Sequence, residues 1–269
     1  MSPRTHPAPP RPALRRRAVA ALLTLAVIAA ANEARAGDAA ARHVLGFSPD
    51  GHYFAFEQYS TLYEQDAAFS EYVAIDTRTD RFVAGTPVRV LIRGDDGLDA
   101  DKARADAAAK AKPLLARLGI GRAGTQTAGK PSMALDEIGI YQMEPQPLAR
   151  ALDVPLPDGR SLSLTLSERA LGSAMCAGYG GTGTVGRAKI VGLQLSMQLG
   201  GATTLLQEDA ALPRSRRCAH AYGIAEAWLH RAPDGGLTLA VLVEYADNDG
   251  YHAGPNRRFL AVTRKLPKP

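Results

Sequence analysis

The sequence predicts an α+β protein that is mainly β, with antiparallel strands and hairpins and one surface helix. Three observations lead to this fold class. Short apolar segments are separated by turn residues, and Pro-Asp-Gly occurs three times, each time before a segment with the period of a strand. Only one segment, residues 99–118, has the composition of a long helix. The sheets are expected to form either propeller-like blades or a sandwich.

The composition is that of a globular protein, and its charge argues against nucleic-acid binding. The chain has 269 residues, of which 46% are apolar and 6% aromatic, and its formal net charge is +5. Six arginines and a single acidic residue lie within residues 1–36, so the rest of the chain has as many basic as acidic residues. Because binding to a phosphate backbone requires an excess of basic residues, no nucleic-acid partner is expected.

Residues 1–36 have the features of a secretory signal peptide. Three consecutive arginines precede the uncharged stretch Ala18–Ala31, and Ala34-Arg35-Ala36 matches the cleavage pattern, which predicts cleavage before Gly37. A helix over Ala18–Ala31 would be roughly 21 Å long, shorter than the ~30 Å hydrocarbon core of a bilayer. The alternatives are an uncleaved N-terminal anchor and, because of the arginine run, twin-arginine export. The general secretory route and a periplasmic or secreted location are favoured.

The mature region, residues 37–269, is expected to be a single β-rich domain without a membrane span, since it has no apolar segment of about 18 residues. Its two cysteines are Cys176 and Cys218. In an oxidising compartment such an isolated pair is most simply a disulfide. The rival interpretation is a catalytic thiol at Cys218, with His220 two residues beyond it. The chain has no C-x-x-C, so neither a redox motif nor a zinc knuckle is predicted.

Residues 43–90 are expected to form an antiparallel meander. In its first hairpin, Ser48-Pro49-Asp50-Gly51 has the residues of a tight turn, and Phe54 and Phe56 share one face of the second strand. The four expected strands are Val44–Phe47, His52–Tyr59, Glu71–Asp76 and Arg81–Val83.

The segment 99–118 is predicted as the helix, with Asp99 or a neighbour as N-cap and Gly119 at its C-terminal end. Pro113 should kink the helix or separate its last turn. A narrow apolar stripe indicates that the helix lies on the surface of a sheet. The stripe consists of Ala103, Ala107, Ala111, Leu114 and Leu118. Residues 119–130 are expected to form a loop.

Residues 133–266 are expected to form a second β region, in which two further Pro-Asp-Gly turns connect hairpins. The expected strands are Ala149–Leu156, Ser161–Arg169, Arg187–Leu199, Tyr222–His230, Leu237–Tyr245 and Arg258–Lys265.

Two sets of motifs carry a resemblance to known families. The stretch Gly46–Glu57, followed by Tyr72–Asp76, resembles one blade of the WD40-like repeats in TolB-type periplasmic propellers. The wider pattern adds the leader, the Gly85–Val90 strand, the Ala-rich helix and R-x-x-x-C-A-x-x-Y from Arg214 to Tyr222. Together these resemble the domain-of-unknown-function 2259 family of predicted secreted bacterial proteins. The resemblance implies an exported protein and no particular activity, ligand or catalytic residue.

Several motifs resemble ligand sites, and each also has a simpler structural interpretation. Gly178–Gly186 contains G-x-G-x-x-G, but a strand is expected after it where a helix is required, so a flexible loop is favoured over a nucleotide site. Tyr245–Gly250 imitates part of a calcium loop but lacks key ligand oxygens, which favours a hairpin turn. Asp95, Asp96, Asp99 and Asp101 form an acidic cluster that suits a helix N-terminus.

The remaining candidates are histidines and arginines. No short metal-ligand spacing and no nucleophile motif occurs, so no catalytic, metal or cofactor residue is predicted. A dispersed site stays open, since catalytic order in sequence is not fixed. The histidines after the leader are His43, His52, His220, His230 and His252. Three arginines beside Cys218 could contact anionic headgroups or glycans, although a solvated face is favoured. They are Arg214, Arg216 and Arg217.

The sequence therefore favours a non-catalytic exported protein that binds an envelope protein or glycan through strand edges or loops. The alternative is a periplasmic hydrolase or metal-dependent enzyme that uses His220 or His252 with nearby acids.

Overall fold

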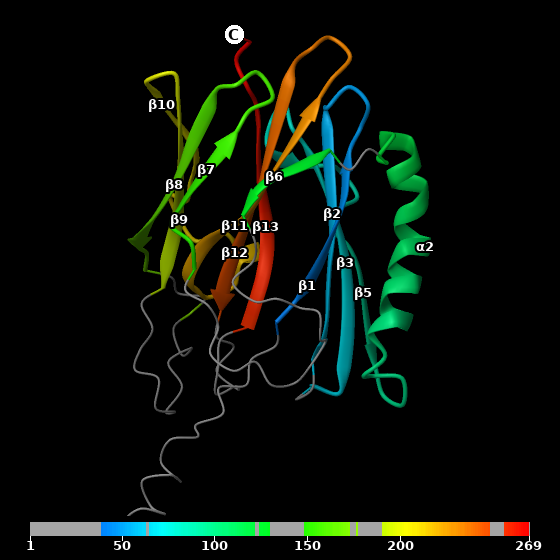
Figure 1. Cartoon of the computed structure of the whole chain (residues 1–269). Coiled ribbons are helices and arrows are strands. Elements are labelled where there is room, and N and C mark those ends of the chain that lie inside the picture. The colour runs from blue at the N-terminus through cyan, green and yellow to red at the C-terminus, as the bar shows by residue number, and fades with distance from the viewer. Residues whose placement is uncertain are drawn as a thin grey trace, which may run out of the picture. The chain divides into compact units, whose positions relative to one another are not determined.

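The computed structural model describes residues 39–62, 65–121, 124–129, 148–172, 176, 190–247 and 256–268. In these residues the chain is mainly β, with three antiparallel sheets and one α-helix (Figure 1), which confirms the predicted fold class. The proposed leader, Gly37, Gly178–Gly186 and His252 lie outside the described residues.

The first sheet is the expected meander, extended by a fifth strand. Strands β1, β2 and β3 are neighbours in that order, and β4 and β5 both pair with β3. The strands are β1 (Ala41–Phe47), β2 (Tyr53–Leu62), β3 (Ala67–Asp76), β4 (Arg81–Phe82) and β5 (Val88–Arg93). The likeness of this region to a WD40-type blade is not confirmed and stays a prediction.

The turn between β1 and β2 fits closely against the neighbouring sheet. Gly51 has a φ of +71°, and a Cβ at this position would lie 2.8 Å from Oγ1 of Thr238. Glycine is therefore required both for the left-handed backbone and for the close approach.

Helix α2 (Ala100–Leu118) has the ends that the sequence predicts. The Asp99 carboxylate accepts a hydrogen bond from the backbone N–H of Lys102 at 2.7 Å, and Gly119 ends the helix in the left-handed conformation. The small residues of the predicted stripe are buried against β3 and β5. Of the two effects predicted for Pro113, the last turn is not separated from the helix, and a kink stays a prediction. Pro113 and Ala109, whose carbonyl loses its helical partner, are both exposed, so water can replace the missing bond.

The central sheet has the order β13-β12-β11-β6 and is buried on both faces. Every residue of β12 is buried, which explains its nearly continuous apolar sequence. The strands are β6 (Thr125–Gly129), β11 (Ala219–Arg231), β12 (Leu237–Asp247) and β13 (Asn256–Lys265). Strand β6 corrects the expected loop over 119–130, because these polar residues pair with the edge of β11. Tyr245–Asp247 belong to β12 and not to a turn.

The outer sheet has the order β10-β9-β8-β7. Its strands are β7 (Ala151–Pro155), β8 (Ser161–Ala170), β9 (Val191–Leu199) and β10 (Ala202–Glu208). The sequence analysis missed β10, which follows β9 through Gly200 and Gly201, both with positive φ. Residues 130–147, at the start of the expected second β region, lie outside the described residues.

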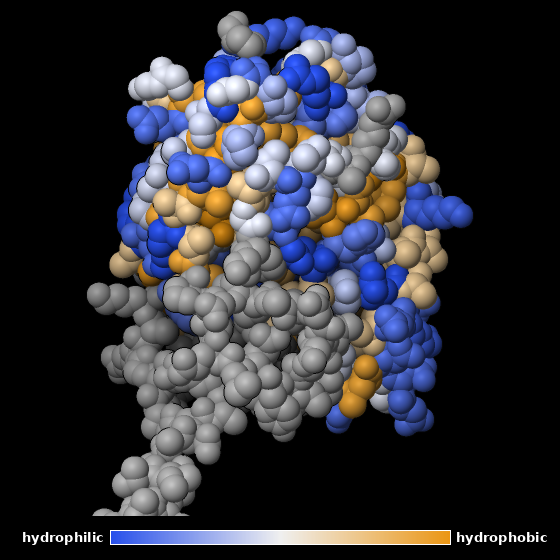
Figure 2. Space-filling model, in the orientation of Figure 1, coloured by the Kyte–Doolittle hydropathy of each residue, from blue (hydrophilic) through white to orange (hydrophobic). Residues whose placement is uncertain are grey.

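The sheets stack as layers, with the central sheet between the outer sheet and the first sheet and with helix α2 on the far side of the first sheet (Figure 1). Alternate side chains of β12 point to opposite layers: Val241 packs toward the outer sheet and Leu242 toward the first sheet. Phe54 and Phe56 share the face toward the central sheet, as predicted. On the face shown in Figure 2, hydrophilic side chains gather along the margin formed by helix α2.

Candidate functional site

A cleft of about 460 Å³ is lined mainly by residues of the first sheet, of the edge strand β13 and of the segment between β10 and β11. Strands β2 to β4 form its floor, β13 forms one wall, and the short 3₁₀ turn η3 (Arg214–Arg216) between β10 and β11 contributes to the other side. The volume is in the range of small-molecule sites in proteins.

Arginine is the prevailing charged residue of the cleft. The lining contains six arginines, namely Arg81, Arg89, Arg214, Arg216, Arg217 and Arg258, and two acidic residues, Glu71 and Asp80. Within the described part of the chain, Arg81, Arg89 and Arg214 form no ion pair with a carboxylate. Positive charges that converge in a cleft with apolar walls concentrate the electrostatic potential there and attract anions.

Two of these arginines meet on one aromatic ring. The guanidinium carbon of Arg89 lies 5.1 Å from the centre of the Phe69 ring, and that of Arg258 lies 4.8 Å from it. The two guanidinium groups are therefore within about 10 Å of each other. Arg258 is buried, and its Nη1 donates to the backbone carbonyl of Arg257 at 2.8 Å.

The turn that carries Arg216 and Arg217 is fixed by the predicted disulfide. Cys176 and Cys218 are bonded, with their Cα atoms 5.7 Å apart, and Cys218 directly follows Arg217. Arg216 lies 3.8 Å from the Asp209 carboxylate, and Arg217 lies 3.6 Å from that of Asp247. The sequence predicts that these three arginines lie on a solvated face. Arg214 is exposed, as predicted, whereas Arg216 and Arg217 are half-buried.

Both carboxylates of the cleft are engaged by neighbouring residues. Asp80 Oδ1 accepts hydrogen bonds from the backbone N–H and the hydroxyl of Thr263, at 2.7 and 2.8 Å, and burial raises the pKa of this carboxyl. Glu71 accepts a hydrogen bond from the Gln58 side chain at 3.1 Å. These contacts hold the two acids against the protein, so the charged groups of the cleft that are available to a ligand are Arg81, Arg89 and Arg214, which form no ion pair with a described carboxylate.

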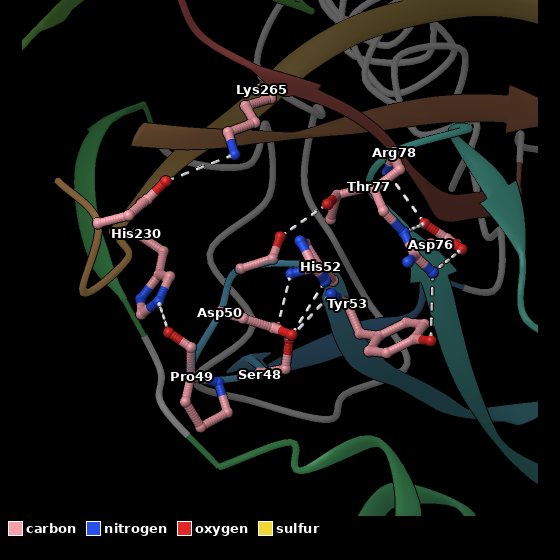
Figure 3. Close-up of polar contacts among 12 residues, drawn as sticks. Ser48, Pro49, Asp50, His52, Tyr53, Asp76, Thr77, Arg78, His230 and Lys265 are labelled. Atoms are coloured by element: carbon pink, nitrogen blue, oxygen red, sulfur yellow. Dashed lines mark hydrogen bonds and ion pairs between the residues drawn. The ribbon is translucent and has the colours of Figure 1, made fainter. Parts of the chain in front are cut away.

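The histidines give no nucleophile site in the part of the chain that the structure describes. At the β1–β2 turn, the Ser48 hydroxyl donates to Asp50 at 2.6 Å, and Nδ1 of His52 lies 2.9 Å from the other Asp50 oxygen (Figure 3). The Ser48 bond, ahead of smaller contributions that include His52, lowers the pKa of Asp50. The carboxylate thus separates the hydroxyl from the imidazole, whereas a triad requires the imidazole between them. Ser48 is also buried, and it accepts a bond from the Tyr53 N–H at 3.0 Å.

Two other histidines have structural contacts. His230 stacks on Phe47, with ring centres 5.2 Å apart, and its Nε2 lies 3.1 Å from the Pro49 carbonyl (Figure 3), so it joins the central sheet to the β1–β2 turn. His43 is exposed and lies 3.7 Å from Glu57.

His220 should make stability depend on pH. Burial lowers its imidazole pKa, and the nearby Arg257 acts in the same direction. Between that lowered pKa and about 6.5 the unfolded chain therefore binds more protons than the folded chain. The free energy of unfolding should fall as the pH drops through about 6.5, by at most about 1.4 kcal/mol per pH unit. Urea unfolding between about pH 8 and pH 5 tests this. The His220→Asn variant should show a weaker pH dependence, and an unchanged dependence would contradict the assignment.

Metal-ligand and membrane-spanning features were also sought in the described residues. No group of three or more His, Cys, Asp or Glu side chains there is arranged to hold a metal ion. Of the acidic cluster, Asp99 caps helix α2. No helix in the same residues has the length and apolar character needed to cross a bilayer.

The sequence analysis identified only the three arginines beside Cys218. Arg81, Arg89 and Arg258 come from three separate strands and have no shared motif, so only the pairing of β3 with β4 and β5, and the position of β13, bring them together.

Comparison with protein-family models gives a match. A family model described as "Predicted secreted protein (DUF2259)" matches residues 55–265, which include all the residues that line the cleft. A search of curated proteins found no match.

Proposed function

Because the chain belongs to the DUF2259 family of predicted secreted proteins, we propose that it is an exported binding protein whose arginine-lined cleft takes an anionic ligand. One observation carries this proposal: six arginines line a cleft whose two acidic residues are engaged by Thr263 and Gln58. The binding surface would then be the cleft, and not the strand edges and loops that the sequence favours. The ligand would come from the envelope or its surroundings.

The export route is part of the same proposal. The leader 1–36 would direct the chain through the general secretory route and be removed before Gly37, which leaves residues 37–269 as one domain in the periplasm or outside the cell. N-terminal sequencing of protein recovered from the envelope fraction should begin at Gly37. Full-length protein confined to the cytoplasm would contradict export.

Anion binding is tested by titration of the purified mature protein. Inorganic phosphate and a small carboxylate, at constant ionic strength, should raise its melting temperature as they bind the folded state. The Arg89→Gln variant should bind about tenfold to a hundredfold more weakly, since a hydrogen bond to a charged group contributes about 1.5–3 kcal/mol.

The matched control is Arg117→Gln, because Arg117 is an exposed arginine of helix α2 that does not line the cleft. It should bind like the wild type. Equal weakening in both variants would indicate a general effect of net charge, and no binding by the wild type would overturn the proposed function.

A further inference from the structure

The floor of the arginine-lined cleft is apolar. Along β3 the residues that line it are Phe69, Glu71, Val73 and Ile75, which alternate on one face of the strand. At about 3.3 Å per residue, this row spans roughly 20 Å. The apolar residues of this row, Phe69, Val73 and Ile75, are at most 4% exposed and pack in the core against the central sheet, so little of the row itself is accessible to a ligand.

An exposed aromatic residue extends this floor at one end. Phe82 of β4 pairs with Ile75, lines the cleft and is 50% exposed. Among the described residues three other large hydrophobic side chains are similarly exposed, and none of them lines this cleft. They are Leu91, Leu98 and Leu205. A hydrocarbon group in the cleft would cover the exposed ring of Phe82 and gain the free energy of removing both surfaces from water.

The other end of the row carries the convergent guanidinium groups. Arg89 pairs with Glu71 across β3 and β5, and its guanidinium shares the Phe69 ring with that of Arg258. Each end has one acidic residue of the lining, Glu71 opposite Arg89 and Asp80 beside Arg81, but two guanidinium groups share one ring only at the Phe69 end. The end at Phe69 is thus the better place for an acidic head group.

We propose that the cleft binds an amphiphilic organic anion. Its acidic head would lie beside Arg89, and its apolar body would lie against the exposed ring of Phe82. This inference rests on the proposed anion-binding function and specifies its ligand class. The volume of about 460 Å³ suits a small molecule.

The test is a homologous series, measured by calorimetric titration below the concentration at which each compound forms micelles. Butyrate, hexanoate, octanoate and decanoate should bind with affinity that rises about fourfold per methylene until the cleft is full. Naphthoate distinguishes an aromatic body from a straight chain, and octanol lacks the charge. Octanol should bind at least tenfold more weakly than octanoate.

Two variants test which part of the ligand lies at each end of the cleft. Phe82→Ser should weaken octanoate binding about fivefold and leave phosphate binding unchanged. Leu205→Ser is its matched control, because Leu205 is 48% exposed and does not line the cleft. Arg89→Gln should weaken the binding of both anions.

The outcomes separate this inference from the proposed function. Phosphate binding without any gain along the carboxylate series would overturn the amphiphilic ligand and leave anion binding in place. Equal binding of octanol and octanoate would overturn the role of the arginines. Absence of binding by every anion would overturn both proposals.

Discussion

Replacement of Cys176 and Cys218 by serine should lower the free energy of unfolding by about 4 kcal/mol. The disulfide closes a loop of 42 positions, and in the chain-entropy model removing such a link increases the freedom of the unfolded chain by about that amount. Cys218 is 2% exposed and lies directly before β11, so the serine hydroxyl would also have to be buried. Urea unfolding of the double variant and of the wild type without reductant measures the difference.

Reductant provides the control for this prediction. It should destabilise the wild type by a similar amount and leave the double variant unchanged, since the variant has no disulfide to lose. The double variant should also bind anions more weakly, because Arg217 adjoins Cys218 and loses its anchor. A wild type that is equally stable with and without reductant would show that the disulfide does not stabilise the fold.

The elements that the sequence predicts well are those with a local chemical signal. Helix α2 lies within one residue of its predicted bounds, because the Asp99 cap and the Gly119 terminus are decided by neighbouring residues. The hairpin β7–β8 has Pro157-Asp158-Gly159 at its turn, and Asp158 accepts a bond from the Arg160 N–H at 3.1 Å. A local turn of this kind brings its own strands into register.

The elements that the sequence analysis missed depend on partners far away in the chain. Strand β6 contains no large apolar residue, and it is a strand because it pairs with β11, about a hundred residues later. The sequence does contain a signal for strand β10, because the two consecutive glycines before it are typical of a type I′ hairpin turn between two strands. For the cleft, the sequence indicates only the three arginines beside Cys218, because the other three come from β4, β5 and β13 and share no motif.

Loss of the ion pair between Glu57 and Arg104 should be the other large effect, because it joins helix α2 to the first sheet. The Glu57 side chain is 1% exposed, and its two oxygens lie 3.0 and 3.2 Å from Nε and Nη2 of Arg104. Ser70, which is fully buried, donates a hydrogen bond to the same carboxylate at 3.0 Å. Glu57→Ala should cost about 3 kcal/mol, and Arg104→Met about 4 kcal/mol, because the second change leaves a buried carboxylate without its cation.

A double-mutant cycle separates the ion pair from the packing of each side chain. The double variant Glu57→Ala/Arg104→Met should be more stable than the sum of the single losses implies, by about 2 kcal/mol, since neither charge is then left unpaired. Leu115 and Leu118 pack on the sheet at the C-terminal end of the helix, but toward its N-terminus the apolar contact is made by the small side chains of Ala103 and Ala107, which bury little area, so the ion pair has a large share in holding that half of the helix. Urea unfolding followed by far-ultraviolet circular dichroism measures all four proteins. Strictly additive losses would show that the pair is not coupled and that the apolar contacts alone hold the helix on the sheet.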